Sequence, residues 1–269
     1  MAIKKFDQYI KESRNNSYLS GEDIPECLIE ILDFIKKQNI KTTKSKDGRV
    51  GSIKDEDDCL DLLKGCEIFD VRNETEYEDR KPINKEKISI LIPKAREWYD
   101  MLVLDKNGNK YYVNIKSSSL KTPDNIGSLS SILYGMFGIK LKETKKTKQY
   151  SELFYHYNKH KDRDDFDNFK NIDYYYLIIN KNITNESFFT SLNHFTKESL
   201  KSNGSNLPFQ CNWSYNSIKV GNKKKVCDII MSTIYNSLLK TIEIFNEKPI
   251  REYIDKYRPY EKNIVNKLF

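Results

Sequence analysis

The chain of 269 residues has a net charge of +7, and its 38% hydrophobic and 32% charged residues are typical of a polar but globular protein. No apolar run approaches the ~18 residues that a membrane-spanning helix needs, and no signal peptide is evident, so we expect a cytoplasmic protein without a membrane partner. Residues 1–90 hold 17 basic and 20 acidic side chains, so the positive charge lies further along the chain, where it either attracts phosphate backbones or forms an ordinary solvated surface.

Two helices are predicted near the start of the chain. Asp23-Ile24-Pro25 marks the first helix start, because proline suits the first helical turn. Its buried stripe would consist of Leu28, Ile29, Leu32 and Ile35. A basic loop is expected over 41–51, followed by a second helix that begins at the capping-box-like Ser52-x-x-Asp55 and ends at Gly65.

Strands and helices alternate over the rest of the sequence. The predicted strands are 67–71, 88–92, 98–104, 111–117, 174–180, 187–192 and 207–212, and the predicted helices are 127–137, 149–158, 223–245 and 250–257. This order predicts the α/β class, with a mixed central sheet flanked by helices and further helices as decoration. We expect one domain over 1–269, because no repeat or low-complexity linker divides it. Its parts would be an N-terminal helical region (1–47), a core (48–215) and C-terminal helices (216–269).

The most informative segment is a predicted β-hairpin around Asn107-Gly108, a strong turn signal between two aromatic and β-branched runs. A two-residue loop would place Asp100 opposite Ile115, on the wrong face of the sheet. A three-residue loop with Gly108 in the left-handed conformation places Asp100 opposite Asn114 instead. Side-chain alternation then brings Lys116 to that same face. We predict the second geometry, which gathers an acid, an amide and a lysine.

Asp100, followed on the next predicted strand by Asn114-Ile115-Lys116, resembles the motif of the PD-(D/E)xK nuclease superfamily, and within it the type II restriction endonucleases. That motif has an acid at the end of one strand and an acid, any residue and lysine on its neighbour. Asn114 therefore stands where the family commonly has an acid, and Tyr99 where it commonly has proline. Longer phrases that look like restriction-enzyme sequences are 48–57, 94–100, 122–126 and 207–213.

The resemblance implies a restriction-endonuclease-like core and an enzyme that hydrolyses double-stranded DNA with Mg²⁺. It also implies a homodimer, because palindromic sites are commonly read by two-fold dimers, and a functional pairing with a cognate DNA methyltransferase. The alternatives are a structure-specific repair or recombination nuclease, and a non-catalytic DNA-binding protein in which the amide at position 114 marks lost activity.

Each candidate site residue has a chemical role in phosphodiester hydrolysis. Asp100 and the carbonyl of Ile115 would offer oxygen ligands to Mg²⁺, and the uncharged Asn114 a weaker one. Lys116 would orient the attacking water and stabilise negative charge in the transition state. Glu56 matches the helix position where family members often add an acid, and it could restore the missing charge. The competing interpretations are an exposed acid for Glu56 and a surface charge pair for Asp100 and Lys116.

Candidate DNA contacts surround this motif. Lys94 and Arg96, just before Asp100, would suit phosphate contacts beside the scissile bond. Lys121 and Asn125 follow the motif strand and are expected to enter the next helix, where amides commonly meet phosphates or base edges. Two amides on the predicted strand 207–212, Gln210 and Asn212, could read adenine by paired hydrogen bonds, although an ordinary half-buried strand gives the same polar alternation.

Overall fold

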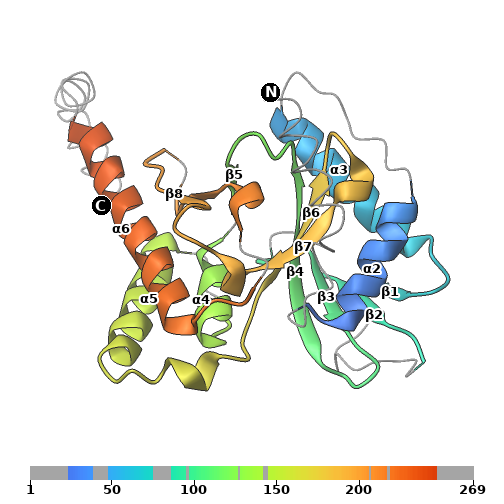
Figure 1. Ribbon diagram of the computed structural model, residues 1–269, viewed down its shortest axis with the longest axis horizontal. Helices are drawn as coiled ribbons and strands as arrows, with labels where there is room; N and C mark the ends of the chain where they lie inside the picture. Colours follow the sequence, from blue (N-terminus) through green and yellow to red (C-terminus); the bar gives the residue numbers. More distant parts are fainter. Residues whose placement is uncertain are drawn as a thin grey trace, which may run out of the picture.

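The computed structural model describes residues 24–38, 48–74, 86–94, 97–126, 128–141, 145–205, 207–216 and 219–246. Its centre is a six-stranded sheet with helices on both faces (Figure 1). The strands, in spatial order, are β1 (Asp70–Asn73), β2 (Ser89–Ile92), β3 (Met101–Leu104), β4 (Lys110–Ser118), β6 (Tyr175–Asn180) and β7 (Phe188–Ser191). This arrangement confirms the predicted mixed sheet flanked by helices.

The sheet is mixed because two of its neighbouring pairs are parallel, β1 with β2 and β4 with β6, while the other neighbours are antiparallel. Every residue of β6 is buried, as expected for a central strand that is covered on both faces. In the parallel pair, Lys116 of β4 lies opposite Ile178 of β6. The carboxyl ends of the two strands therefore lie at the same end of the sheet, and the polar residues of β4 lie towards this end.

Helices cover both faces of the sheet, with the first two helices on one side and the last three on the other (Figure 1). The helices are α2 (Glu26–Lys37), α3 (Gly48–Lys64), α4 (Leu129–Phe137), α5 (Lys146–Lys161) and α6 (Lys223–Asn246). Leu28, Leu32 and Ile35 of α2 are buried as predicted, and Cys27 and Ile31 complete the stripe, whereas Ile29 is only half-buried. Short 3₁₀ helices cover 166–169, 184–186, 192–194 and 213–215.

Two apolar clusters show which way the side chains of β4 point. Val113 and Ile115 pack in the cluster that includes α2 and α3, whereas Tyr112 packs in the cluster that includes α4 and α6. Because side chains alternate along a strand, Asn114 and Lys116 share the face of Tyr112. The prediction that Asn114 and Lys116 lie on the same face of the sheet is consistent with these two clusters.

The structure corrects the predicted start of the second helix. Residues 48–51 belong to α3, so the predicted loop over 41–51 is wrong in this part, and its residues 41–47 lie outside the described residues. Asp55 is fully buried rather than placed in the first turn as a cap. Packing of α3 against β4 outweighs the roughly 1 kcal/mol by which each glycine disfavours a helix interior.

A second, three-stranded sheet was not predicted. It consists of β5 (Asp124–Asn125), β9 (Gln210–Cys211) and β8 (Leu200–Lys201). Asn125 therefore lies on a strand and does not enter the next helix, which begins at Leu129 after the N-cap Ser128. The predicted strand 207–212 shortens to two residues, because Pro208 has no N–H to offer a sheet. The predicted helix over 250–257 lies outside the described residues.

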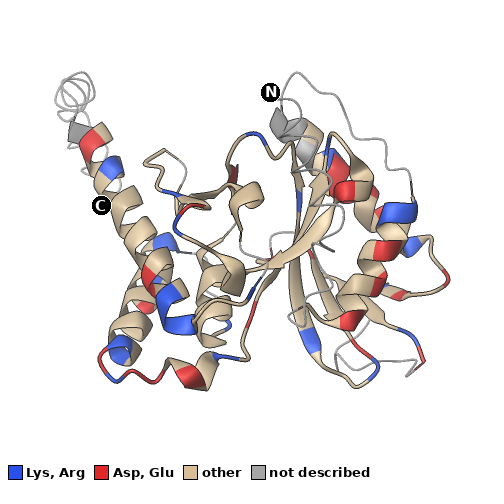
Figure 2. Cartoon of the chain, viewed as in Figure 1, with Lys and Arg blue, Asp and Glu red and all other residues tan. Residues whose placement is uncertain are grey.

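Charged side chains differ between the two sides of the sheet. Acidic segments recur along α2 and α3, and basic segments along α5 and α6 (Figure 2). Within the described residues, α5 and α6 carry part of the positive charge of the later part of the sequence. Within the described ranges, no helix combines the length and the apolar character needed to cross a membrane.

Candidate functional site

The hairpin between β3 and β4 has the predicted geometry. Gly108 has a φ of +84°, and its N–H donates to the carbonyl of Asp105 at 3.0 Å. Asp105 N–H donates to the carbonyl of Asn109 at 3.1 Å, which leaves a three-residue loop. Met101 pairs with Val113, so the next residue outward in this register, Asp100, falls at Asn114. The three-residue loop and the resulting register are confirmed.

Asp100 is fixed at the start of β3 by the neighbouring strand. Its N–H donates to the carbonyl of Val113 at 2.9 Å, and its carboxylate accepts from the N–H of Ile115 at 2.7 Å. Burial raises the pKa of Asp100, while Lys116 and the Ile115 N–H oppose that shift. One oxygen of the carboxylate is thus held by the Ile115 N–H, and the second oxygen can bind a cation.

Asn114 presents a buried oxygen that lacks a partner. The residue is 8% exposed, and its Oδ1 atom finds no hydrogen-bond partner among the described residues. An unsatisfied buried acceptor costs about 1–3 kcal/mol. Such a cost is tolerated where a ligand completes the site, and a metal ion is a suitable ligand for an amide oxygen beside a carboxylate.

Lys116 and Glu56 form an ion pair from two different elements. Lys116 Nζ of β4 lies 3.7 Å from Glu56 Oε1 of α3, and the two side chains are 19% and 22% exposed. Burial raises the pKa of Glu56 to about 7; Lys116 opposes this shift and the charge of Asp100 adds to it. Glu56 is therefore not a solvated acid of the run around it, and Lys116 is not an exposed surface charge.

Asp55 anchors α3 beside this pair, a role that sequence analysis missed because it assigned Asp55 to a helix cap. Its fully buried carboxylate accepts from Ser117 Oγ at 2.6 Å and lies 3.9 Å from Lys181 Nζ. Asp55 thus accepts a hydrogen bond from Ser117, and the adjacent Glu56 forms an ion pair with Lys116, the residue before Ser117 on β4. The double contact holds the helix in register with the strand that carries the predicted motif.

The predicted DNA contacts fall into two groups. Lys94 and Lys121 are exposed in loops that follow β2 and β4, Asn125 is exposed on β5, and Arg96 lies outside the described residues. Gln210 already accepts from Asn203 at 2.8 Å. Asn212 is 8% exposed, and its amide oxygen accepts from the N–H and hydroxyl of Ser214. The latter two amides thus make internal contacts, so the structure favours the ordinary-strand interpretation for them.

The oxygen atoms at the site suit a hard cation that takes only some of its ligands from the protein. Among the described residues, no three His, Cys, Asp or Glu side chains gather closely enough to hold a metal ion. A cation held by Asp100 would therefore need the Asn114 oxygen, backbone carbonyls, water or phosphate oxygens as well. Mg²⁺ commonly binds in this way, through one or two carboxylates with water and substrate phosphates.

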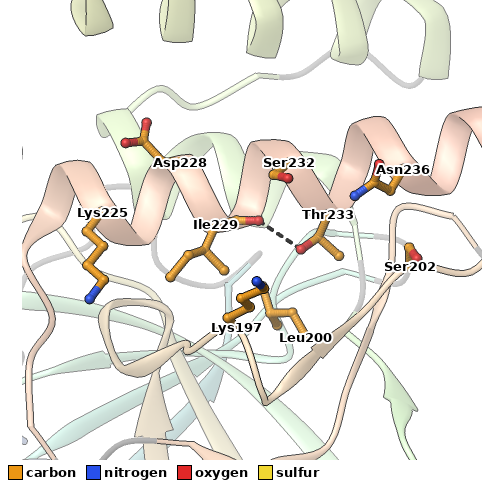
Figure 3. A pocket seen from close by; sticks show the side chains of 9 residues that line it. All are labelled: Lys197, Leu200, Ser202, Lys225, Asp228, Ile229, Ser232, Thr233 and Asn236. Atoms are coloured by element: carbon orange, nitrogen blue, oxygen red, sulfur yellow. Dashed lines mark hydrogen bonds between the residues drawn. The ribbon is translucent and has the colours of Figure 1, made fainter.

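A separate pocket of about 420 Å³ lies between α6 and the segment before and within β8 (Figure 3). Its lining residues are Lys197, Leu200, Ser202, Lys225, Asp228, Ile229, Ser232, Thr233 and Asn236. Asp228 accepts from Tyr157 at 2.6 Å, and Thr233 donates to the carbonyl of Ile229 at 2.8 Å. These groups are bound within the protein and none belongs to the predicted motif, so the pocket is not the candidate site.

No protein-family model matches the chain, and no curated protein is significantly similar to it. Function must therefore be inferred from the groups at the site. Cys59, on the same helix as Glu56, is fully buried and burial raises its pKa to about 12, which makes it a poor nucleophile. Two carboxylates, a free amide oxygen and a lysine favour metal-assisted chemistry on an anionic substrate.

Proposed function

We propose that the protein is a Mg²⁺-dependent endonuclease that cuts double-stranded DNA at a specific short sequence. The observation that carries this proposal is the unpartnered oxygen of Asn114, buried beside the fixed carboxylate of Asp100 and one strand step from Lys116. These groups come from adjacent strands whose register agrees with the superfamily motif. The enzyme would act within a restriction-modification system, as a homodimer, with a methyltransferase protecting the same sites.

Asp100 and Asn114 would hold the cation, with the carbonyl of Ile115 as a further ligand. Bound Mg²⁺ would supply positive charge at the scissile phosphate and lower the pKa of a coordinated water. Lys116 would donate hydrogen bonds to the attacking water and to the phosphate oxygens, where negative charge develops. Glu56 would keep the Lys116 ammonium in place and add negative charge to the site.

The positive charge beyond the sheet supports a DNA substrate. The exposed Lys94 follows β2, the neighbour of β3, and the exposed Lys121 follows β4, which carries Asn114 and Lys116. Both positions suit contacts to the DNA backbone. Phosphate contacts of this kind give affinity that falls steeply as salt increases. Sequence readout would require further groups, for which the exposed Asn125 is a candidate.

Digestion of plasmid DNA with Mg²⁺ tests the proposed function. Discrete fragments with one common end sequence are expected, and sequencing of those ends would give the recognition site. Nicks placed by DNA structure would indicate a repair or recombination nuclease instead. Intact plasmid together with a gel shift would indicate a binding protein without activity, the outcome that the amide at position 114 would then explain.

Asn114→Asp is expected to stay active and to lower the Mg²⁺ concentration for half-maximal cleavage by about three- to tenfold, because a carboxylate is a stronger ligand than an amide. Without metal, the added anion should weaken DNA binding, most visibly at low salt. Titration of metal and DNA measures both effects. Asn107→Asp, in the exposed hairpin loop, should change neither. An inactive Asn114→Asp enzyme with unaltered metal affinity would mean that the amide acts as a hydrogen-bond donor.

A further inference from the structure

The small sheet of β5, β9 and β8 has one buried and one exposed face. Residues directly opposite each other on neighbouring strands point to the same face. On one face, Leu200 and Cys211 are opposite each other and lie in the apolar cluster that also includes residues of α6. The row on the other face consists of Asn125, Gln210 and Lys201. Its outer members are exposed and its central member is half-buried, so this face presents three polar side chains next to one another.

Contacts at the end of β4 hold the small sheet beside the candidate site (Figure 1). Ser118, the last residue of β4, donates from its hydroxyl to the carboxylate of Asp124 on β5. The loop between them is fixed as well, because the carbonyl of Ser119 accepts from Asn182 Nδ2 at 2.8 Å. Lys116 lies two residues before Ser118, about 7 Å along the strand and on the same face. The exposed row is therefore carried by a sheet that is fixed beside the groups proposed to bind the cation.

Gln210 presents a fixed hydrogen-bond donor within this row. The N–H of Ser205 donates to Asn203 Oδ1 at 2.9 Å, so the NH₂ end of Asn203 is free to donate to Gln210 Oε1, at 2.8 Å. With its oxygen engaged, Gln210 has only its NH₂ group left for another partner. Lys201 adds an ammonium group with three donors, and its side chain makes no hydrogen bond or ion pair with the other described residues. Lys201 and Gln210 together therefore offer donors to an external acceptor.

Guanine suits these donors better than the other bases do. In the major groove, guanine presents two acceptors, N7 and O6, whereas adenine presents one acceptor and one donor. Because the oxygen of Gln210 is occupied, it cannot make the paired hydrogen bonds to adenine that the sequence suggested. Neighbouring strands lie about 4.8 Å apart, so the row spans about 10 Å. This length equals about three base steps of ~3.4 Å, which suits a short recognition site.

We propose that the exposed face of the small sheet enters the major groove and reads a guanine through Lys201 and the NH₂ group of Gln210. This inference rests on the proposed sequence-specific function and names its base-reading groups. Cleavage at a specific sequence requires contacts to base edges, because phosphate contacts carry no sequence information directly. The exposed Asn125, on the strand beside Gln210, is placed to contact a neighbouring base pair.

The test is a selection of duplex DNA from a randomised library, with Ca²⁺, another cation that takes oxygen ligands, in place of Mg²⁺. Bound duplexes are separated by gel shift and sequenced. Wild type is expected to select a site with a G·C pair that Lys201→Ala no longer selects. The affinity of Lys201→Ala for the wild-type site should fall about tenfold or more, and its affinity for unrelated DNA less than about threefold. Lys201→Arg should keep the guanine preference, because arginine donates to the same two acceptors.

Gln210→Glu removes the second donor while preserving the internal contact. Glutamate keeps an oxygen that can accept from the Asn203 NH₂ group, so the fold should be retained. The preference for guanine at the same or the adjacent base pair should be lost. Lys170→Ala is the matched control for loss of a charge, because Lys170 is exposed after the 3₁₀ helix 166–169, at the opposite end of the molecule from the small sheet (Figure 1). This control should select the same site as wild type.

An unchanged selected site, with affinity lowered equally for all sequences, would make Lys201 a phosphate contact. That result would overturn the inference and leave the proposed function intact. A preference lost only at A·T pairs would overturn the assignment to guanine. If wild type selected no sequence, the inference and the proposed sequence-specific function would both fall. If the selected duplexes were not cut with Mg²⁺, the base-reading face would stand and the proposed endonuclease activity would fall.

Discussion

Asp100→Ala and Lys116→Ala should each reduce cleavage by about a thousandfold or more, while DNA affinity stays within a few-fold of wild type. The neighbouring strand fixes the carboxylate of Asp100 beside Asn114, so loss of Asp100 removes a charged ligand from the cation at that place. Loss of Lys116 removes the donor that would stabilise charge on the phosphate. Affinity depends instead on phosphate contacts spread over a larger surface.

Single-turnover cleavage and gel-shift assays, with and without Mg²⁺, separate the two effects. Lys110→Ala is the matched control, because Lys110 is exposed at the far end of the same strand and should tolerate truncation. Cleavage within tenfold of wild type by either Asp100→Ala or Lys116→Ala would remove the proposed site. A melting temperature measured for each variant distinguishes loss of chemistry from loss of fold.

The local part of this site could be predicted from the sequence, because short-range rules decide it. Asn107-Gly108 sets a tight turn, and the left-handed conformation that glycine tolerates selects the three-residue loop. Once the loop is known, alternation fixes the faces of Asp100, Asn114 and Lys116. β-branched and aromatic runs mark β3, β4 and β6, and the order of the predicted helices and strands indicated the mixed sheet.

The long-range part could not be predicted in the same way. Asp55 and Ser117 are 62 residues apart, and no periodicity links a helix residue to one particular strand residue. Asp55 looked like a helix cap because its spacing from Ser52 fits one, yet α3 begins four residues earlier at Gly48.

Glu56→Gln is expected to stabilise the fold and to weaken the metal site. Burial raises the pKa of Glu56 from its ordinary value near 4.5 to about 7, so the folded protein holds this proton more tightly than the unfolded chain does. The contribution of Glu56 to stability is therefore undiminished at low pH and is lost as pH rises from about 4.5 to 7. Glutamine keeps the shape of the protonated acid, so this loss should disappear in the variant.

At pH 8, Glu56→Gln should raise the free energy of unfolding by about 2 kcal/mol, which is less than the full pKa shift implies because the side chain is 22% exposed. At pH 4 the two proteins should be equally stable. Urea denaturation at both pH values measures the difference. Asp61→Asn, at an exposed acid of the same helix that pairs with Lys64, should stay within about 0.5 kcal/mol of wild type.

The Mg²⁺ concentration for half-maximal cleavage should change in the opposite direction and rise about tenfold in Glu56→Gln, because a site with an amide at position 114 depends on each remaining carboxylate. Glu56→Gln should therefore raise the free energy of unfolding and at the same time weaken metal binding. This combination is expected of a residue whose charge serves function although its burial destabilises the fold. Stabilisation at pH 8 with an unchanged metal titration would mean that the Glu56 carboxylate contributes nothing to the cation. A loss of stability at pH 8 would mean that its attraction to Lys116 exceeds the cost of burying it, and the raised pKa of Glu56 would be wrong.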